Sequence, residues 1–218
     1  LDECRLFTSG FAGNDTLLGF LDSDEVFFLE AVFQDDAGSG VGDASTCFNP
    51  GLYAVGTSAT LVLDDVEEGE TIRQTLDFLN ESTTVDGQPA VRRALNATAQ
   101  SVSGPETENF SGSETFRVDG LRIQNLSETF QIMSSGSRSG SESYEPCRLD
   151  RFDLQAGQTF TQEYNTSESF TENGQTTTSE ESVIVTTRFD GIESVTVPAG
   201  TFSACRFTET IGSENNTF

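Results

Sequence analysis

The sequence contains no histidine, no lysine and no tryptophan, and all eleven of its positively charged side chains are arginines. Without histidine, the chain lacks the usual general base near neutral pH and the commonest side-chain ligand for transition metals. Without lysine, it cannot form a Schiff base or a Ser–Lys catalytic pair. The groups left for catalysis are carboxylates, tyrosines and cysteines, which allow a glycosidase-like carboxylate pair and few other reactions.

Positive charge is scarce, because 11 basic side chains stand against 36 acidic ones and give a net charge of −25. A surface of this kind repels phosphate groups, and its longest basic cluster is Arg92-Arg93, so we expect no nucleic-acid partner. Two interpretations of the acidity remain open: adaptation to salt, which screens the carboxylates, and compositional drift in an exported protein. Eighteen phenylalanines indicate a true core and argue against a disordered chain.

Long apolar runs are also missing. The most apolar stretch, VFFLEAVF at 26–33, is too short to cross a membrane and contains Glu30. No signal peptide precedes Leu1. We therefore expect a mature, soluble chain without a membrane span, located in the periplasm, at the cell surface or outside the cell.

The four cysteines are widely separated and show no CxxC spacing, which excludes zinc-finger and thioredoxin-type sites. In a chain rich in serine and threonine, this pattern predicts two disulfides formed in an oxidising compartment. Of the three pairings we favour Cys4–Cys47 with Cys147–Cys205, because each bridge then stays within one half of the chain. Four buried free thiols are the alternative.

Seven of the ten asparagines lie in N-x-S/T sequons, more than the composition would give by chance. If they carry glycans, these asparagines lie on exposed surface. The alternative is that asparagine, serine and threonine gather in polar turns and on polar strand faces. The candidates are Asn14, Asn80, Asn96, Asn109, Asn125, Asn165 and Asn215.

Period-two alternation recurs along the chain, whereas helical periodicity is nearly absent. Asn or Asp followed by Gly suits the two positive-φ positions of a type I′ turn, so each such pair predicts a hairpin. The pairs are Asp86-Gly87, Asp119-Gly120, Asn173-Gly174 and Asp190-Gly191. We predict an all-β fold: a curved antiparallel sheet, half-barrel or sandwich built from hairpins, with an N-terminal extension.

The Asn173-Gly174 hairpin can be predicted residue by residue. A two-residue turn places Tyr164 opposite Val183 and Phe160 opposite Thr187. The outer part of this hairpin is polar, so it faces solvent or is covered by another chain; we favour solvent.

Composition divides the chain into regions. Residues 1–46 are predicted to be an extension that docks on the sheet, and residues 47–218 form the β domain. The polar segment 134–143 is a loop or linker, so the β domain consists of two halves, 47–133 and 144–218.

Few residues are candidates for chemistry. Asp35, Asp36 and Asp43, with glycines between them, form a weak Ca²⁺ candidate; the alternative is a solvated acidic linker, and no other cofactor is expected. Acidic residues adjacent in a strand point to opposite faces, so a glycosidase pair would have to assemble from distant strands. The strand phenylalanines form a core or enclose an apolar ligand.

The stretch GIESVTVPAGTFSACRFTET at 191–210 resembles a "VTVPAGTF-x-AC-[KR]-F" strand motif of a group of uncharacterised exported bacterial proteins. The segments CFNPGLYAVGTSAT at 47–60 and LDRFDLQAGQTFTQEY at 149–164 also look like strand starts of that group. The resemblance implies a curved antiparallel sheet, distantly similar to the LolA-type half-barrel of periplasmic carriers, and implies no binding residues. Such proteins continue with an aromatic strand, whereas this sequence stops at Phe218, so we expect either that the chain is truncated or that an edge is left unpaired, and an open edge accepts a neighbouring strand.

These features favour a non-enzymatic exported protein that acts by binding or by self-assembly, with other proteins or further copies of itself as partners. The first alternative is a periplasmic carrier of an apolar ligand such as a lipid. The second is a carboxylate-pair glycoside hydrolase.

Overall fold

The computed structural model describes residues 27–32, 42–67, 70–101, 107–133, 137–197 and 200–214. These residues form long strands and two short 3-10 helices, η2 and η3. The helices are η2 (Ala44–Cys47) and η3 (Pro50–Tyr53). The strands are β1 (Phe27–Val32), β2 (Ser58–Glu67), β3 (Glu70–Val85), β4 (Gln88–Ser101), β5 (Thr107–Asp119), β6 (Arg122–Met133), β7 (Ser137–Arg151), β8 (Thr159–Glu172), β9 (Gln175–Val197) and β10 (Gly200–Glu214).

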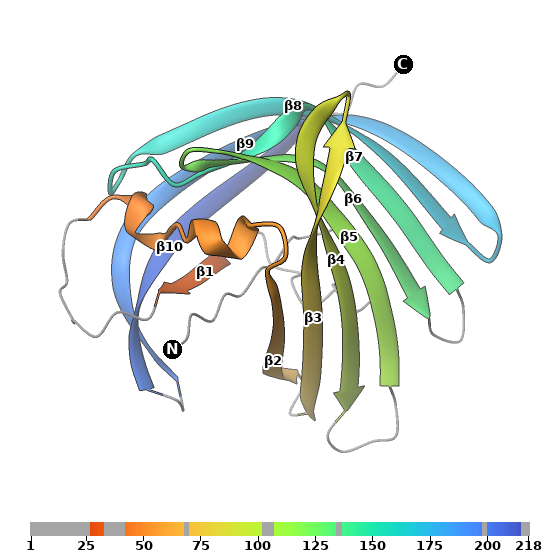
Figure 1. Cartoon of the computed structure of the whole chain (residues 1–218), viewed down its shortest axis with the longest axis horizontal. Coiled ribbons are helices and arrows are strands. Elements are labelled where there is room, and N and C mark those ends of the chain that lie inside the picture. The colour runs from red at the N-terminus through yellow and green to blue at the C-terminus, as the bar shows by residue number, and fades with distance from the viewer. Residues whose placement is uncertain are drawn as a thin grey trace.

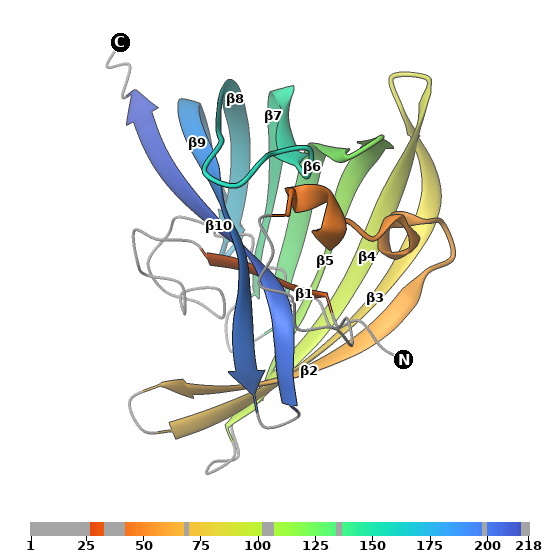
Figure 2. The same cartoon turned by 90° about the vertical axis from the view of Figure 1, so that its left-hand side faces the viewer.

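All ten strands belong to one antiparallel sheet, in the order β1-β10-β9-β8-β7-β6-β5-β4-β3-β2. From β2 to β10 each strand pairs with the next one in the sequence, and β1 is added outside β10. The sheet is strongly curved, and η2 and η3 lie on its concave side (Figures 1 and 2). Its edges are β1 and β2, so it is not closed. The all-β prediction of a curved antiparallel sheet is confirmed.

Two of the four predicted hairpin turns form as expected. Asp86 and Gly87 have φ values of 52° and 73°, and Asn173 and Gly174 have φ values of 50° and 77°, as a type I′ turn requires. In the second hairpin Tyr164 pairs with Val183 and Phe160 with Thr187, so the predicted register is confirmed. Its tip is exposed over residues 173–181.

The other two Asx-Gly pairs behave differently. The β5–β6 turn is shifted by one residue, because Asp119 ends β5 by pairing with Arg122. The hairpin predicted at Asp190-Gly191 is wrong, since β9 continues through it. There the register with β10 shifts by one residue, so Asp190 is the extra residue of a β-bulge, and Gly191 has a φ of 130°. Asp190 accepts a hydrogen bond from Thr208 on β10 at 2.6 Å, which ties the bulge to the neighbouring strand.

The N-terminal region contributes to the sheet, because β1 pairs with residues 203–208 of β10. This pairing shows that the unpaired edge expected near the end of the sequence is wrong for those residues. The linker predicted at 134–143 is also wrong over 137–143, which begin β7 and pair with both β6 and β8. The sheet thus continues from one predicted half into the other.

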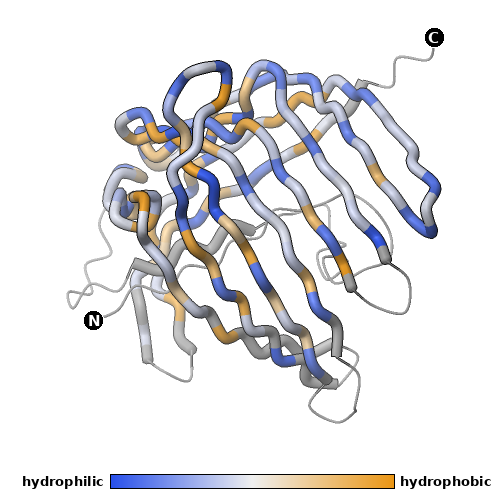
Figure 3. Tube along the Cα trace, turned by 45° about the vertical axis from the view of Figure 1, so that its right-hand side comes forward, coloured by the Kyte–Doolittle hydropathy of each residue, from blue (hydrophilic) through white to orange (hydrophobic). Residues whose placement is uncertain are grey.

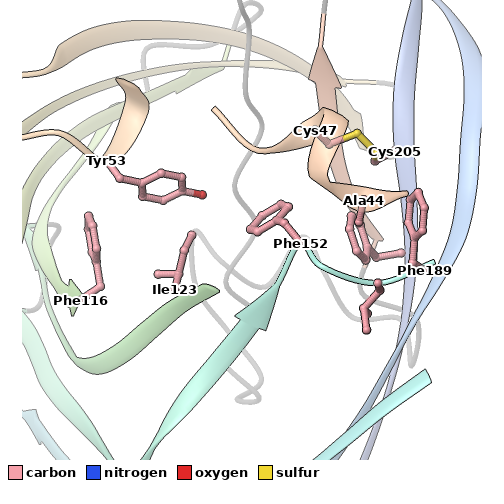
Figure 4. Packing of buried hydrophobic residues seen from close by; sticks show 10 residues of the cluster. Ala44, Cys47, Tyr53, Phe116, Ile123, Phe152, Phe189 and Cys205 are labelled. Atoms are coloured by element: carbon pink, nitrogen blue, oxygen red, sulfur yellow. A yellow bond between two sulfur atoms is a disulfide. The ribbon is translucent and has the colours of Figure 1, made fainter. Parts of the chain in front are cut away.

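Hydrophobic and hydrophilic positions alternate along the strands (Figure 3), and the core lies on the concave side beneath η2 and η3. The aromatic cluster, as we call it, is made of ten buried residues and is shown in Figure 4. Its rings meet at 5 to 6 Å, for example Phe189 with Phe207 at 5.0 Å and Tyr53 edge-on to Phe116 at 5.6 Å. The cluster consists of Ala44, Cys47, Tyr53, Phe116, Ile123, Phe152, Leu154, Phe189, Cys205 and Phe207.

A disulfide joins Cys47 of η2 to Cys205 of β10 inside the aromatic cluster. The favoured pairing, Cys4–Cys47 with Cys147–Cys205, is therefore wrong. The bridge joins the two predicted halves of the chain, because β10 lies next to η2 in the curved sheet. Cys147 is a free thiol whose pKa is raised by burial, and Cys4 lies outside the described residues.

Candidate functional site

The concave face changes character at Arg93 of β4, whose side chain is buried. Its guanidinium lies over the rings of Tyr53, Phe78 and Phe116, at 4.9 to 5.3 Å from their centroids. The same group donates hydrogen bonds to Asn80 Oδ1 at 3.1 Å and to Glu114 Oε2 at 3.4 Å. Arg93 therefore joins the aromatic cluster to the polar part of the face.

The polar part is dominated by a glutamate row, defined as Glu114, Glu128, Glu142 and Glu168. Glu114 pairs in register with Glu128, Glu128 with Glu142, and Glu142 with Glu168, across β5, β6, β7 and β8. Residues directly opposite each other in neighbouring strands point to the same face of a sheet. The row therefore extends the concave-face line that begins with Asn80 and Arg93.

The glutamate row places like charges on adjacent strands, which destabilises a sheet. Burial raises the pKa of Glu114 to about 7, against the opposing effect of Arg93. Burial and the neighbouring Glu128 raise the pKa of Glu142 to about 7, and burial also raises the pKa of Glu128. The fold therefore disfavours the charged form of three of the four carboxyl groups.

One hydroxyl group joins the middle of the row. The Tyr144 hydroxyl lies 2.9 Å from Glu128 Oε1 and 3.1 Å from Glu142 Oε2. The two carboxylate oxygens are therefore no more than about 6 Å apart. Tyr144 is buried and packs edge-on to Tyr164 of β8, with ring centroids 5.6 Å apart. Tyr144 directly follows Ser143, at the point where the β6–β7 register shifts between Asn125 and Ser127.

A second charged group lies on the same face beside the aromatic cluster. Arg148 Nη2 is 3.8 Å from Glu209 Oε2, and Arg148 Nε is 4.0 Å from Asp150 Oδ1. Burial lowers the pKa of Arg148, but Asp150 and Glu209 outweigh it and the net change is upward. The Nε–H is buried and makes no hydrogen bond to the described residues. Arg148 thus keeps one donor without an acceptor, beside a surplus of carboxylates.

The concave face can act chemically in two ways. Its carboxylate oxygens can accept hydrogen bonds from the amino, guanidinium or hydroxyl groups of a partner. Alternatively, a carboxyl with a raised pKa beside a second carboxylate has the composition of a hydrolytic acid–base pair. The sequence singles out none of the four glutamates, because only the sheet register brings them together.

The calcium candidate is only partly described. Asp43 accepts a hydrogen bond from Ser45 N at 3.1 Å and caps η2, while Asp35 and Asp36 lie outside the described residues. Within the described ranges, no group of three or more acidic or cysteine side chains is arranged to hold a metal ion. The Ca²⁺ hypothesis stays a prediction.

The structure separates the sequon asparagines by face. Asn80 is 1% exposed, its amide donates to Leu52 O and Ala54 O, and Asn125 donates to Asp150 on the concave face. The exposed ones are Asn96, Asn109 and Asn165, which alternate with concave-face neighbours and so lie on the convex face. Asn14 and Asn215 lie outside the described residues.

Comparison of the chain with protein-family models, with curated proteins and with solved structures found no match. In the part of the chain that the structure describes, no helix has the length and apolarity needed to cross a membrane.

Proposed function

We propose that this chain is an exported, non-enzymatic protein that acts by binding, and that the concave face around the glutamate row is its binding surface. The observation that carries the proposal is the in-register line of four glutamates beside Tyr144 and Arg148. Like charges on adjacent strands lower stability, and strain of this kind is typical of functional sites. The partner that fits carries amino, guanidinium or hydroxyl groups.

The burial of the row supports a role in contact with a partner. The Glu114 side chain is 21% exposed, and all four glutamates are intermediate in burial, so their oxygens are partly open to solvent. Groups that are partly desolvated before binding lose less hydration when a partner arrives, and their hydrogen bonds are stronger than those of fully solvated groups.

A charge-matched pair of variants tests the binding surface. Binding of a lysine-rich peptide and of a neutral oligosaccharide panel is measured by titration calorimetry at physiological salt, with Glu168→Gln and Glu163→Gln compared to the wild type. Each variant removes one negative charge from β8, on the concave face for Glu168 and on the convex face for Glu163. We expect Glu168→Gln alone to weaken binding of one probe by about tenfold, the effect of losing one charge-assisted hydrogen bond. Equal effects of both variants would mean non-specific attraction to an acidic surface.

The proposed location outside the cytoplasm is supported by the Cys47–Cys205 disulfide, which forms in oxidising compartments. It is tested by cell fractionation combined with thiol labelling of the native protein. If the sequons carry glycans, glycopeptide mass spectrometry should find them on Asn96, Asn109 or Asn165, and not on Asn80, whose amide is buried and hydrogen-bonded.

Self-assembly remains a second version of the binding proposal. Within the described residues, the edges β1 and β2 each pair with one strand only. Exposed strand edges accept further strands. Sedimentation at high protein concentration and high salt should then reveal oligomers, and a single monomeric species under those conditions would refute this version.

One observation favours a different class of function, a carboxylate-pair hydrolase. The facing oxygens of Glu128 and Glu142 lie within about 6 Å through Tyr144, close to the separation used by retaining glycosidases. Hydrolysis of a glycoside panel should then be lost in both Glu128→Gln and Glu142→Gln, and activity that survives both substitutions would eliminate the idea. The apolar-carrier alternative lacks such support, because Phe116, Phe152 and Phe207 pack within the aromatic cluster.

A further inference from the structure

Tyr144 has two carboxyl neighbours within hydrogen-bond distance of its hydroxyl group. A tyrosine hydroxyl carries one hydrogen and can donate it to one oxygen at a time. Both Glu128 Oε1 at 2.9 Å and Glu142 Oε2 at 3.1 Å lie within hydrogen-bond distance of that oxygen. If both glutamates were ionised, one carboxylate oxygen would face the hydroxyl oxygen with no hydrogen between them.

We propose that Glu128, Tyr144 and Glu142 form a proton-binding site, in which the two carboxyl groups share one extra proton through the Tyr144 hydroxyl at neutral pH. With that proton in place, one glutamate donates to the hydroxyl and the hydroxyl donates to the other, so both short contacts become hydrogen bonds. The pair then carries one negative charge, which also relieves the repulsion between neighbouring strands.

The surroundings of the pair favour uptake of the proton. Arg148 is the cation whose charge acts on both Glu128 and Glu142, and it also interacts with Asp150 and Glu209, whereas Arg93 interacts with Glu114. Six carboxyl groups therefore face two guanidinium groups, and the Tyr164 phenol stays neutral because burial raises its pKa to about 12. The ionisable groups around Glu128 and Glu142 are Arg93 on β4, Glu114 on β5, Tyr144, Arg148 and Asp150 on β7, Tyr164 and Glu168 on β8, and Glu209 on β10.

The shared proton makes the stability of the sheet depend on pH. In the unfolded chain a glutamate has a pKa near 4.5, and in the fold burial and Glu128 raise the pKa of Glu142 to about 7. Between these values the folded state holds a proton that the unfolded state has released, so stability falls as pH rises from 4.5 towards 7. The two glutamates titrate as a pair, and the loss belongs to the pair.

Urea unfolding at pH 5 and pH 8 tests the proposal with Glu142→Gln and the exposed convex-face control Glu163→Gln. A glutamine at 142 donates its amide hydrogen to the Tyr144 oxygen at any pH. In the wild type we expect the unfolding equilibrium constant to rise by about ten- to a hundredfold between the two pH values. Glu142→Gln should lose about tenfold of that rise, whereas Glu163→Gln should keep all of it. An unchanged rise in Glu142→Gln would overturn the proposal.

A spectroscopic measurement makes the test independent of folding stability. Carbon-13 NMR of glutamate-labelled wild-type protein follows each side-chain carboxyl during a pH titration of the folded state. We expect a carboxyl that is still protonated near pH 6 and whose titration is absent from Glu142→Gln or, should that variant not fold, altered in Tyr144→Phe. Finding that every glutamate except Glu114 and Glu209 ionises fully below pH 5 would rule out the shared proton.

Discussion

The concave face has two regions that share strands β5 and β6 and contribute to stability in opposite directions. The aromatic cluster lies beneath η2 and η3, and its Leu154 and Phe189 side chains are fully buried. It also contains the Cys47–Cys205 disulfide. The glutamate row places like charges side by side on neighbouring strands from β5 to β8. Burial makes the charged form of these carboxyl groups less stable, as the raised pKa of Glu114 indicates. The aromatic cluster stabilises the fold and the glutamate row destabilises it, as expected of a scaffold that carries a binding surface.

Removing the disulfide should produce the largest loss, because it weakens the stabilising region directly. Replacing both Cys47 and Cys205 by Ala frees a loop of 158 residues and should lower the free energy of unfolding by about 4 kcal/mol. Urea unfolding at pH 7 measures the difference. Cys147→Ala, which breaks no bridge, is the control and should change stability much less. Equal midpoints for the double variant and the wild type would contradict the role given to the bridge.

Arg93 connects the two regions, and its loss should affect both. Arg93→Gln removes a buried cation from three aromatic rings and from Glu114, and should cost about 3 kcal/mol because it breaks a buried ion pair. It should also raise the pKa of Glu114 further, so its stability should fall more steeply with pH than that of the wild type. A loss of stability with no change in pH dependence would show that the two regions are not coupled through this residue.

Glu114→Gln should make stability depend less on pH, the opposite of the effect expected for Arg93→Gln. Because the pKa of Glu114 is raised from 4.5 to about 7 in the fold, stability falls as pH rises through this range, and the loss is complete above it. Between pH 5 and pH 8 the variant should therefore lose about 1 to 2 kcal/mol less stability than the wild type. Thermal or urea unfolding at both pH values gives the double difference, and identical pH dependence in the two proteins would show that Glu114 ionises normally.

Arg92 supplies the smallest expected effect and a direct contrast with its neighbour. Its ion pair with Glu81 lies on the convex face, with both side chains about half exposed. Arg92→Gln should change the free energy of unfolding by less than about 1 kcal/mol and should leave the pH dependence as it is. An effect as large as that of Arg93→Gln would mean that burial does not explain the difference in stability expected for the two arginines.

The sequence predicts those parts of the fold that depend on local chemistry. The Asn173-Gly174 turn sets its register because both residues tolerate positive φ. The same dipeptide chemistry also suits a bulge, and at Asp190-Gly191 the chain forms the bulge, with Asp190 in contact with Thr208 and Arg206 of β10. Turn propensity alone cannot separate these two outcomes.

The candidate site depends on information that no local pattern contains. The glutamate row requires the register of three strand pairs at once, including the shift between Asn125 and Ser127. The cysteine pairing likewise follows from curvature that brings β10 next to η2. From the sequence one expects a carboxylate pair to come from distant strands, and only the sheet register identifies Glu128 and Glu142.

The position of β1 has a consequence for how the protein is made. Phe27 pairs with Thr208, so β1 can take its place in the sheet only after the roughly 180 residues between them have been synthesised. At ordinary elongation rates that interval is roughly ten to thirty seconds. During this time β1 has no partner strand in the sheet.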